Sequence, residues 1–238
     1  MCIWGAAMLK IENLDLKYSQ SQILQGISLE APVGQVTCVT GTNGVGKTSL
    51  LKAIAGRHPY SGGTITLNGV DVPSGRAATA AKLGVGYVPQ GREIFPLMTV
   101  EENLQTGFAC LPKADHQIPD TIFDLFPVLS EMKARRGGDL SGGQQQQLSI
   151  ARALITQPKV LLLDEPTEGI QPNIIQMIGQ TIQLLRERGD LAIVLVEQNF
   201  DFAYQNSDHF HIMQRGQINQ SLPKSQAKRD TLLSALAL

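Results

Sequence analysis

The stretch GTNGVGKT, residues 41–48, decides the fold of this chain. It fits the pattern GxxxxGK followed by Ser or Thr, which forms a loop that holds phosphate through backbone N–H groups and a lysine. The motif requires a strand before it and a helix after it. Residues 35–40, QVTCVT, are a short β-branched run, and residues 47–56, KTSLLKAIAG, have helical spacing and end at a glycine. Both flanks favour a phosphate loop over an ordinary glycine-rich turn.

This phosphate loop, residues 41–48, is expected to supply both phosphate and metal ligands. We expect Lys47 to bridge the β- and γ-phosphates of a nucleotide and Thr48 to hold Mg²⁺. The glycines let backbone N–H groups point inward, and the following helix adds positive potential at its N-terminus. The residues predicted to bind nucleotide here are Gly41, Thr42, Asn43, Gly44, Val45, Gly46, Lys47, Thr48 and Ser49.

A second acidic element complements the loop. VLLLDEP, residues 160–166, places Asp164 and Glu165 at the end of a predicted buried strand. An aspartate there can hold Mg²⁺ through water, and the adjacent glutamate can polarise the attacking water. Both carboxylates could instead cap the next helix. Beside a phosphate loop, the pair argues for hydrolysis rather than nucleotide storage.

Strands and helices alternate along most of the chain, which predicts an α/β fold with a mostly parallel sheet covered on both faces. The predicted strands are residues 9–18, 35–40, 85–90, 159–165 and 191–197, with hairpins at 63–72, turning at Asn68-Gly69, and at 209–219. Helices are predicted at 47–56, near 118–134, at 141–157, 172–188 and 199–206, and after a capping box formed by Thr99 and Glu102. The segment after about residue 221 is also expected to be helical.

The helical middle of the chain is interpreted as an insertion into one α/β domain. The predicted boundaries are 8–238 for the domain, about 8–90 and 158–238 for its core, about 91–157 for the helical subdomain, and 1–7 for a flexible extension. The glutamine run 144–147 is expected to be solvated helix surface. His209 and His211 are expected to lie on the surface or in an edge strand.

Composition excludes several functional classes. Lys plus Arg is 20 and Asp plus Glu is 21, so the chain lacks the basic bias of nucleic-acid binding proteins. Its three cysteines have no ligand-like spacing, which predicts a reduced chain without disulfides or a zinc site. No apolar stretch approaches the roughly 18 residues that cross a bilayer. Any action at a membrane is therefore expected to go through partners.

LSGGQ, residues 140–144, gives the chain its resemblance to the ATP-binding cassette family, the ATPase subunits of ABC transporters. The resemblance covers nearly all of residues 8–220 in the family's motif order. It implies a P-loop NTPase (RecA-like) core with an antiparallel β subdomain and an inserted helical subdomain. It implies ATP and Mg²⁺ as cofactors. Tyr18 matches the aromatic residue that stacks on adenine, and Gln90 matches the Q-loop glutamine, which contacts Mg²⁺ or water.

The signature, residues 140–144, has a physical interpretation of its own. Ser141, Gly142 and Gly143, followed by Gln144, open a helix whose free N–H groups face outward at its positive end. A simple N-cap of small residues is the alternative. In the family, this motif binds the γ-phosphate held by the opposing subunit. The resemblance therefore implies a head-to-tail dimer with a second ATPase subunit, different from this one in the cell and possible as a homodimer in isolation.

The remaining partners also follow from the resemblance. Gln90 leads into the helical insertion, where the family docks its membrane subunits. Two permease subunits and, indirectly, a solute-binding protein are therefore expected, with the chain peripheral on the cytoplasmic side of a bacterial plasma membrane. Segments such as QGREIFPLMTVEENL, residues 90–104, and DEPTEGIQPNII, residues 164–175, look like the branch that imports branched-chain amino acids. Within it they look most like the second ATPase subunit of urea transporters, so urea is the expected solute and branched-chain amino acids the alternative.

Two positions depart from the family pattern. The D-loop, which usually ends in aspartate, has Gln171, and the switch histidine is replaced by Gln198. The glutamine amide can donate to a γ-phosphate and accept from water, but it cannot gain a proton near neutral pH. The hypothesis is that Gln198 senses the γ-phosphate while Glu165 orients the water and Lys47 holds the phosphates. A solvent-facing residue at a helix start is the alternative for Gln198.

Two other functional classes remain to be weighed. Soluble cassette ATPases of DNA repair or translation usually carry long coiled coils, two cassettes in one chain or a basic surface, and none is visible here. A non-hydrolysing regulatory cassette is opposed by the presence of Lys47, Asp164 and Glu165. If the partner subunit has the ordinary histidine and aspartate, the two ATP sites of the dimer would differ chemically.

Overall fold

The computed structural model of the chain describes residues 7–229 and residue 232. Its strands are β1 (Ala7–Tyr18), β2 (Ser21–Pro32), β3 (Val36–Thr40), β4 (Gly62–Leu67), β5 (Val70–Asp71), β6 (Val85–Val88), β7 (Val160–Asp164), β8 (Ala192–Val196), β9 (His209–Gln214) and β10 (Gln217–Pro223). They form an antiparallel sheet in the order β2-β1-β4-β5 and a second sheet in the order β10-β9-β3-β8-β7-β6. In the second sheet only β10 runs antiparallel to its neighbour.

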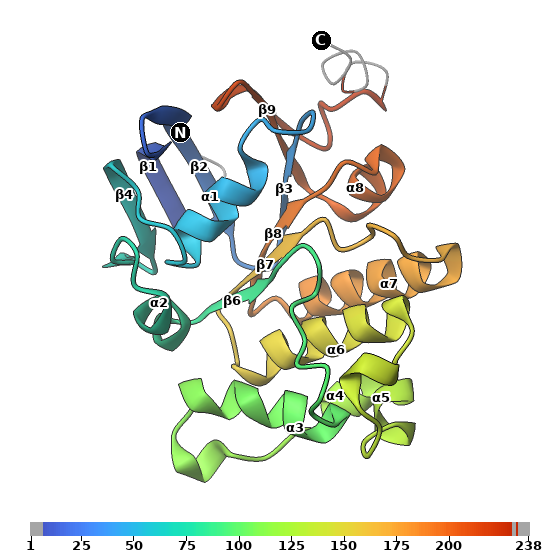
Figure 1. Cartoon of the computed structure of the whole chain (residues 1–238). Coiled ribbons are helices and arrows are strands. Elements are labelled where there is room, and N and C mark those ends of the chain that lie inside the picture. Colours follow the sequence, from blue (N-terminus) through green and yellow to red (C-terminus); the bar gives the residue numbers. More distant parts are fainter. Residues whose placement is uncertain (1–6, 230–231, 233–238) are drawn as a thin grey trace.

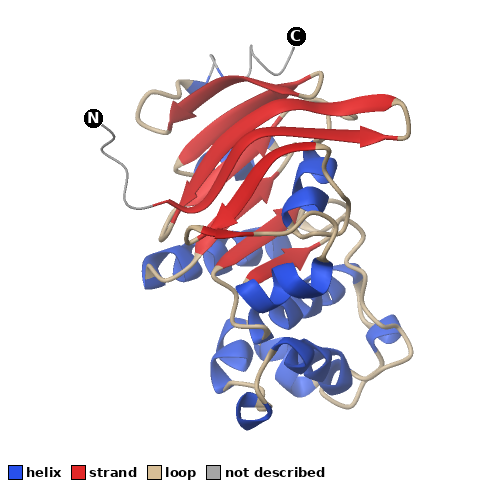
Figure 2. Ribbon diagram, turned by 90° about the vertical axis from the view of Figure 1, so that its left-hand side faces the viewer, coloured by secondary structure: helices blue, strands red, loops and turns tan. Residues whose placement is uncertain are grey.

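The helices cover the second sheet and extend beyond it. They are α1 (Lys47–Ile54), α2 (Ala77–Leu83), α3 (Val100–Gln105), α4 (Asp120–Leu125), α5 (Pro127–Glu131), α6 (Gly142–Ile155), α7 (Pro172–Arg188) and α8 (Phe200–Asn206), with short 3-10 turns at Thr106–Cys110, Lys113–Asp115 and Gly137–Asp139. Figure 1 shows α3 to α6, the segment between β6 and β7, at the opposite end of the molecule from the antiparallel sheet. Figure 2 shows the strands in the upper part and these helices below. The predicted α/β fold with an antiparallel sheet and an inserted helical segment is confirmed.

The parallel strands are buried on both faces, which explains their unbroken apolar sequence. In β7, Val160 and Leu162 join the core cluster that contains α1 and the antiparallel sheet. Leu161 and Leu163 point the other way, into the cluster formed with α6 and α7. All four are fully buried, and each such side chain contributes about 1.5–3 kcal/mol of hydrophobic stabilisation. The sheet is therefore the central layer between two cores.

The carboxyl ends of the parallel strands meet at one edge of the sheet. Val39 of β3 and Asp164 of β7 both pair with Val196 of β8, and Val88 of β6 pairs with Leu163. The loops that follow these strands must therefore converge. Such an edge is where open α/β sheets bind ligands, and it is where the chain places the phosphate loop.

Local signals placed several elements correctly and others incorrectly. The predicted hairpin turn is present, with both Asn68 and Gly69 at positive φ (50° and 74°). The single helix predicted near residues 118–134 is instead two helices, because Phe126 precedes Pro127 and is turned out of the helical region. The sequence patterns missed β2 and α2.

Burial corrects two further expectations. Gln146 and Gln147 are only 4% and 1% exposed, so this half of the glutamine run is not solvated surface. Helix α6 lies between the sheet and the other helices of the insertion, and both cover it. His209 and His211 lie in β9, which pairs with β10 on one side and β3 on the other. The expectation of an edge strand is therefore wrong, because β10 forms the edge.

The two ends of the chain are only partly described. Of the predicted extension at residues 1–7, Ala7 is already paired in β1 opposite Pro32, and residues 1–6 lie outside the described part. At the other end, β10 continues to Pro223, so the predicted helix does not begin at residue 221. Residues 230–231 and 233–238 lie outside the described part. No helix within the described residues is long and apolar enough to cross a membrane.

Candidate nucleotide-binding site

A cavity of about 670 Å³ opens at the carboxyl edge of the parallel strands. It gathers most of the residues predicted from separate sequence motifs. Those that line it are Tyr18, Asn43, Gly44, Gly46, Lys47, Thr48, Ser49, Gln90, Glu165 and Gln198. Gly41, Thr42 and Val45 complete the same loop without lining the cavity, and Asp164 lies behind Thr48. Ile23, Thr167, Glu168, Glu197 and Asn199 line the cavity but were not predicted.

The phosphate loop takes a conformation that its glycines permit. Gly46 has φ 109°, and a Cβ atom there would lie 2.8 Å from Leu24 Cδ2, so a larger residue does not fit. Lys47 is 5% exposed, and its Nζ donates to the carbonyl oxygens of Gly41 (2.8 Å) and Thr42 (2.9 Å). Burial lowers the pKa of Lys47, while the charge of Glu165, whose Oε1 is 3.7 Å away, opposes that shift. The loop thus holds the ammonium group at the cavity wall.

Asp164 sits beneath the cavity with two hydroxyl partners. Thr48 Oγ1 donates to Asp164 Oδ1 (3.0 Å), and the Tyr87 hydroxyl donates to Oδ2 (3.1 Å). Burial raises the pKa of this carboxyl, and the hydrogen bonds from Thr48 and Tyr87 act in the opposite direction. The end of β7 therefore meets the start of α1 through a hydroxyl–carboxylate pair.

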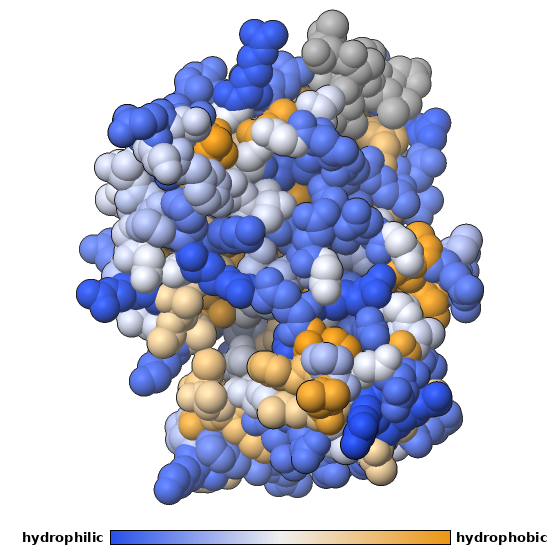
Figure 3. All heavy atoms as spheres, viewed as in Figure 1, coloured by the Kyte–Doolittle hydropathy of each residue, from blue (hydrophilic) through white to orange (hydrophobic). Residues whose placement is uncertain are grey.

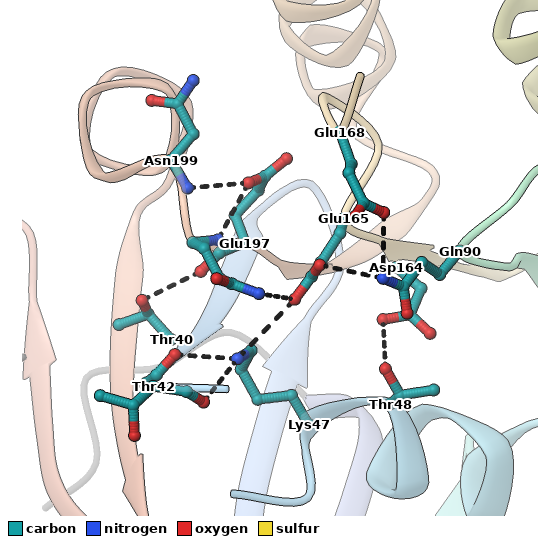
Figure 4. A network of polar contacts seen from close by, with 12 residues as sticks. Thr40, Thr42, Lys47, Thr48, Gln90, Asp164, Glu165, Glu168, Glu197 and Asn199 are labelled. Atoms are coloured by element: carbon teal, nitrogen blue, oxygen red, sulfur yellow. Dashed lines mark hydrogen bonds and ion pairs between the residues drawn. The ribbon is translucent and has the colours of Figure 1, made fainter. Parts of the chain in front are cut away.

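The carboxylate of Glu165, at the mouth of the cavity, accepts hydrogen bonds from the two glutamines predicted to belong to the site. Gln198 Nε2 donates to Glu165 Oε1 (2.5 Å), and Gln90 Nε2 lies 3.4 Å from Oε2. Gln90 also donates to Glu168 Oε2 (2.9 Å). Figure 4 shows Glu165 between Lys47 and Gln90. Residues from three loops thus reach one carboxylate.

Tyr18 forms the far wall of the cavity. It is 39% exposed, and the ring of His58 meets it edge-on, with centroids 4.2 Å apart and an interplanar angle of 63°. The ring is therefore supported from one side and available to a planar ligand.

We expect Tyr18→Ala to weaken ATP binding with little effect on kcat. Stacking of a base on an aromatic ring contributes about 1–3 kcal/mol, so the Kd for ATP should rise at least about fivefold. Titration with a fluorescent ATP analogue measures this. Tyr18→Phe keeps the ring and should bind as the wild type does. An unchanged Kd for the alanine variant would remove the stacking role.

The signature lies apart from this cavity. Ser141 caps α6: its hydroxyl accepts from Gln144 N–H (3.3 Å), and Gln144 Oε1 accepts from Ser141 N–H (2.9 Å). Gly143 packs against Ile174, where a Cβ atom would lie 2.8 Å from Cγ1. All five signature residues, 140–144, are absent from the cavity lining. The chain therefore carries two separate candidate phosphate-binding surfaces.

Among the cavity residues that the sequence motifs did not predict, Glu197 is the most deeply buried. It directly follows the buried strand β8, as Glu165 directly follows β7, and it is 2% exposed. A carboxylate that closes an apolar strand was the signal used for Asp164 and Glu165. The same signal would have singled out Glu197.

Comparisons with known proteins agree with this geometry. The sequence profile of the ABC transporter family matches residues 24–168. The chain is 38% identical over 212 residues to the high-affinity branched-chain amino acid transport ATP-binding protein BraG of Pseudomonas aeruginosa, covering 89% of this chain and 91% of the relative. It is 36% identical over 212 residues to the probable branched-chain amino acid transport ATP-binding protein LivF of Archaeoglobus fulgidus, with 89% and 90% covered.

Two solved structures extend the comparison to the fold. A nucleotide-free ATP-binding cassette from an ABC transporter has a TM-score of 0.83 at 25% identity, covering 98% of this chain and 96% of that chain. A cassette in its ADP conformation has a TM-score of 0.82 at 26% identity, covering 96% and 95%. The chain therefore belongs to the ABC transporter family, as an ATP-binding subunit with ATPase activity.

Proposed function

We propose that this chain hydrolyses ATP to drive an importer of branched-chain amino acids. Two relatives that align with this chain over almost their whole length are named for the transport of branched-chain amino acids. Urea, the solute expected from finer resemblance, has no support among these relatives, so branched-chain amino acids become the first proposal. The observation that carries the hydrolytic role is the position of Glu165, which Gln198 contacts and Lys47 approaches to 3.7 Å at the phosphate loop.

Six residues at the cavity have proposed tasks in hydrolysis: Lys47, Thr48, Gln90, Asp164, Glu165 and Gln198. Lys47 and the loop N–H groups bind the phosphates, and Glu165 polarises a water whose oxygen attacks the γ-phosphorus, giving ADP and phosphate. The Thr48 hydroxyl and the Asp164 carboxylate fit Mg²⁺, because it prefers oxygen ligands and needs few from the protein. Bound there, Mg²⁺ would neutralise phosphate charge. Gln90 and Gln198 hold Glu165 from opposite sides.

The separation of the two phosphate-binding surfaces supports a head-to-tail pair of cassettes. Ser141 and the glycines that open α6 do not line this chain's own cavity. A γ-phosphate carried by a second cassette would reach them, and this chain's cavity would in turn receive the partner's signature. Both subunits are then needed to complete each ATP site.

An apolar surface beside the Q-loop is the proposed contact with the permease. Phe95, Leu97 and Met98 are 46%, 81% and 40% exposed, and Figure 3 shows hydrophobic side chains gathered over the β6–α3 loop and the neighbouring helices. Exposed apolar patches of this kind mark interaction sites. The loop starts just after Gln90, whose amide contacts Glu165. A movement of Glu165 would therefore be transmitted to this surface through only a few residues.

Transport by the assembled complex tests the proposed solute. The chain is co-expressed with the candidate permease subunits, partner cassette and binding protein from the same genome, and the complex is reconstituted in liposomes. We expect leucine, but not urea, to stimulate ATP hydrolysis and to be taken up. Stimulation by urea alone would replace the proposed solute, and failure to recover permease subunits would remove the importer role.

We expect Gln198→Ala to lower kcat about tenfold, because it removes the amide donor from Glu165. The rate of ATP hydrolysis by the assembled transporter measures this loss. Gln198→His should retain more activity and gain an additional pH dependence between about pH 6 and 8, since a histidine titrates there and an amide does not. An unchanged rate for the alanine variant would contradict the proposed role.

A further inference from the structure

Glu197 is a buried carboxylate that the proposed chemistry leaves without a task. It follows β8 directly and is 2% exposed. Burial raises the pKa of its carboxyl, and hydrogen bonds from Thr167 and from the backbone N–H groups of Asn199, Thr167 and Gln198 oppose this shift. A carboxylate in such a place is costly unless its oxygens are well satisfied.

Each carboxylate oxygen of Glu197 contacts a different loop. Oε1 accepts from Thr167 N–H (3.1 Å) and from the Thr167 hydroxyl (2.7 Å). Oε2 accepts from the N–H groups of Gln198 and Asn199, both at 3.0 Å. The carbonyl oxygen of Glu197 accepts from the hydroxyl of Thr40, at 3.0 Å. Figure 4 shows the contacts of Glu197 with Thr40 and Asn199, beside the group formed by Lys47 and Glu165.

One residue therefore connects the segments that carry the reacting groups. Thr40 is the last residue of β3 and precedes the phosphate loop, Thr167 follows Glu165 by two positions, and Gln198 is the next residue after Glu197. The backbone N–H of Glu165 also donates to the carbonyl oxygen of Val196 (2.9 Å). Because Gln198 is held at its backbone and Thr167 at both of its donors, the separation between the two loops is fixed.

We propose that Glu197 is a positioning residue for hydrolysis: its carboxylate holds the loop of Gln198 against the loop of Glu165. The amide of Gln198 then reaches Glu165 at a set distance, while the side chains of both loops remain exposed to the cavity. This inference rests on the proposed roles of Gln198 and Glu165. It assigns to Glu197 no contact with nucleotide.

A glutamine at position 197 cannot reproduce the four contacts. A carboxylate accepts on both oxygens, whereas an amide accepts on one and donates from the other end. An NH₂ group facing Gln198 and Asn199 would meet two donors. If it faced Thr167 instead, the hydroxyl could rotate to accept but the backbone N–H would lose its partner. Glu197→Gln should therefore keep the contacts to Gln198 and loosen the connection between the loops.

Steady-state hydrolysis by the full-length chain tests the proposal. We expect Glu197→Gln to lower kcat about tenfold and to change KM for ATP less than about twofold, because small misplacements of reacting groups slow the chemical step. In the double variant with Gln198→Ala, the loss should be clearly smaller than the product of the single losses, since residues that act through one another are not additive. Glu187→Gln, the same substitution at an exposed position of α7, is the matched control and should retain full activity.

Thr167→Val gives a second, milder variant in case position 197 does not tolerate change. It removes one hydrogen bond to Glu197 Oε1 and should lower kcat about threefold with KM unchanged, while thermal unfolding reports whether each variant is folded. A wild-type kcat in folded Glu197→Gln, or fully multiplicative losses in the double variant, would overturn the proposal. Glu165→Gln separates the two ideas: if it is active, the proposed chemistry fails, and if it is inactive beside a fully active Glu197→Gln, only the positioning role fails.

Discussion

We expect Glu165→Gln to lower kcat for ATP hydrolysis by about 10²- to 10⁴-fold, the range contributed by a positioned general base. The substitution keeps the size of the side chain and its place after β7. It removes the carboxylate that acts as the base for a proton of the attacking water, and an amide cannot take over that role. ATP binding should persist, because the contacts of Lys47 to Gly41 and Thr42 do not involve Glu165. Single-turnover hydrolysis together with an ATP-binding titration separates the two effects.

The neighbouring carboxylate provides the control. Glu168 lies in the same loop, lines the same cavity and accepts from Gln90 at 2.9 Å, yet it has no contact with Lys47 or Gln198 among the described residues. Glu168→Gln removes the same charge and should lower kcat by less than about tenfold. Equal losses in the two variants would mean that the charge of the cavity matters, and that Glu165 has no special role.

The phosphate loop and the acidic strand end were predictable because each is a local pattern. In GTNGVGKT, glycines such as Gly46 determine the backbone conformation of the loop. The apolar run in VLLLDE predicts a buried strand followed by carboxylates. Their proximity followed from parallel strands ending at one edge. The hydrogen bond from Thr48 to Asp164, 116 positions apart, is the direct result.

The features that escaped prediction depend on packing between distant segments. The burial of Gln147 is decided by the neighbours of α6, and the internal place of β9 is decided by where β10 pairs. The contacts of Glu197 could be predicted only by knowing that the loop after β8 lies against the loop after β7. No local sequence pattern indicates which of these distant segments pack together. The glutamate was nonetheless visible at the end of an apolar run, which is the one local sign of its importance.

We expect Lys47→Ala to reduce hydrolysis by about 10²- to 10³-fold, the cost of removing one preorganised donor to a transferring phosphoryl group. Unlike Glu165→Gln, it should also weaken ATP binding, because the lost charge faces both the bound and the reacting phosphates. The two carbonyl oxygens of Gly41 and Thr42 would lose their donor as well, so the empty loop should become less ordered. An ATP titration and a rate measurement on the same preparation give both losses.

Two further variants separate charge from shape. Lys82→Ala removes the same charge from an exposed position on α2 and should be without effect. Lys47→Arg keeps the charge, but a planar guanidinium cannot replace an ammonium held between two carbonyl oxygens at 2.8 and 2.9 Å. If the ammonium acts as a point donor, the arginine variant should lose nearly as much activity as the alanine variant. If it retained wild-type activity, charge alone would explain the role of Lys47, and the two carbonyl contacts would serve only to shape the loop.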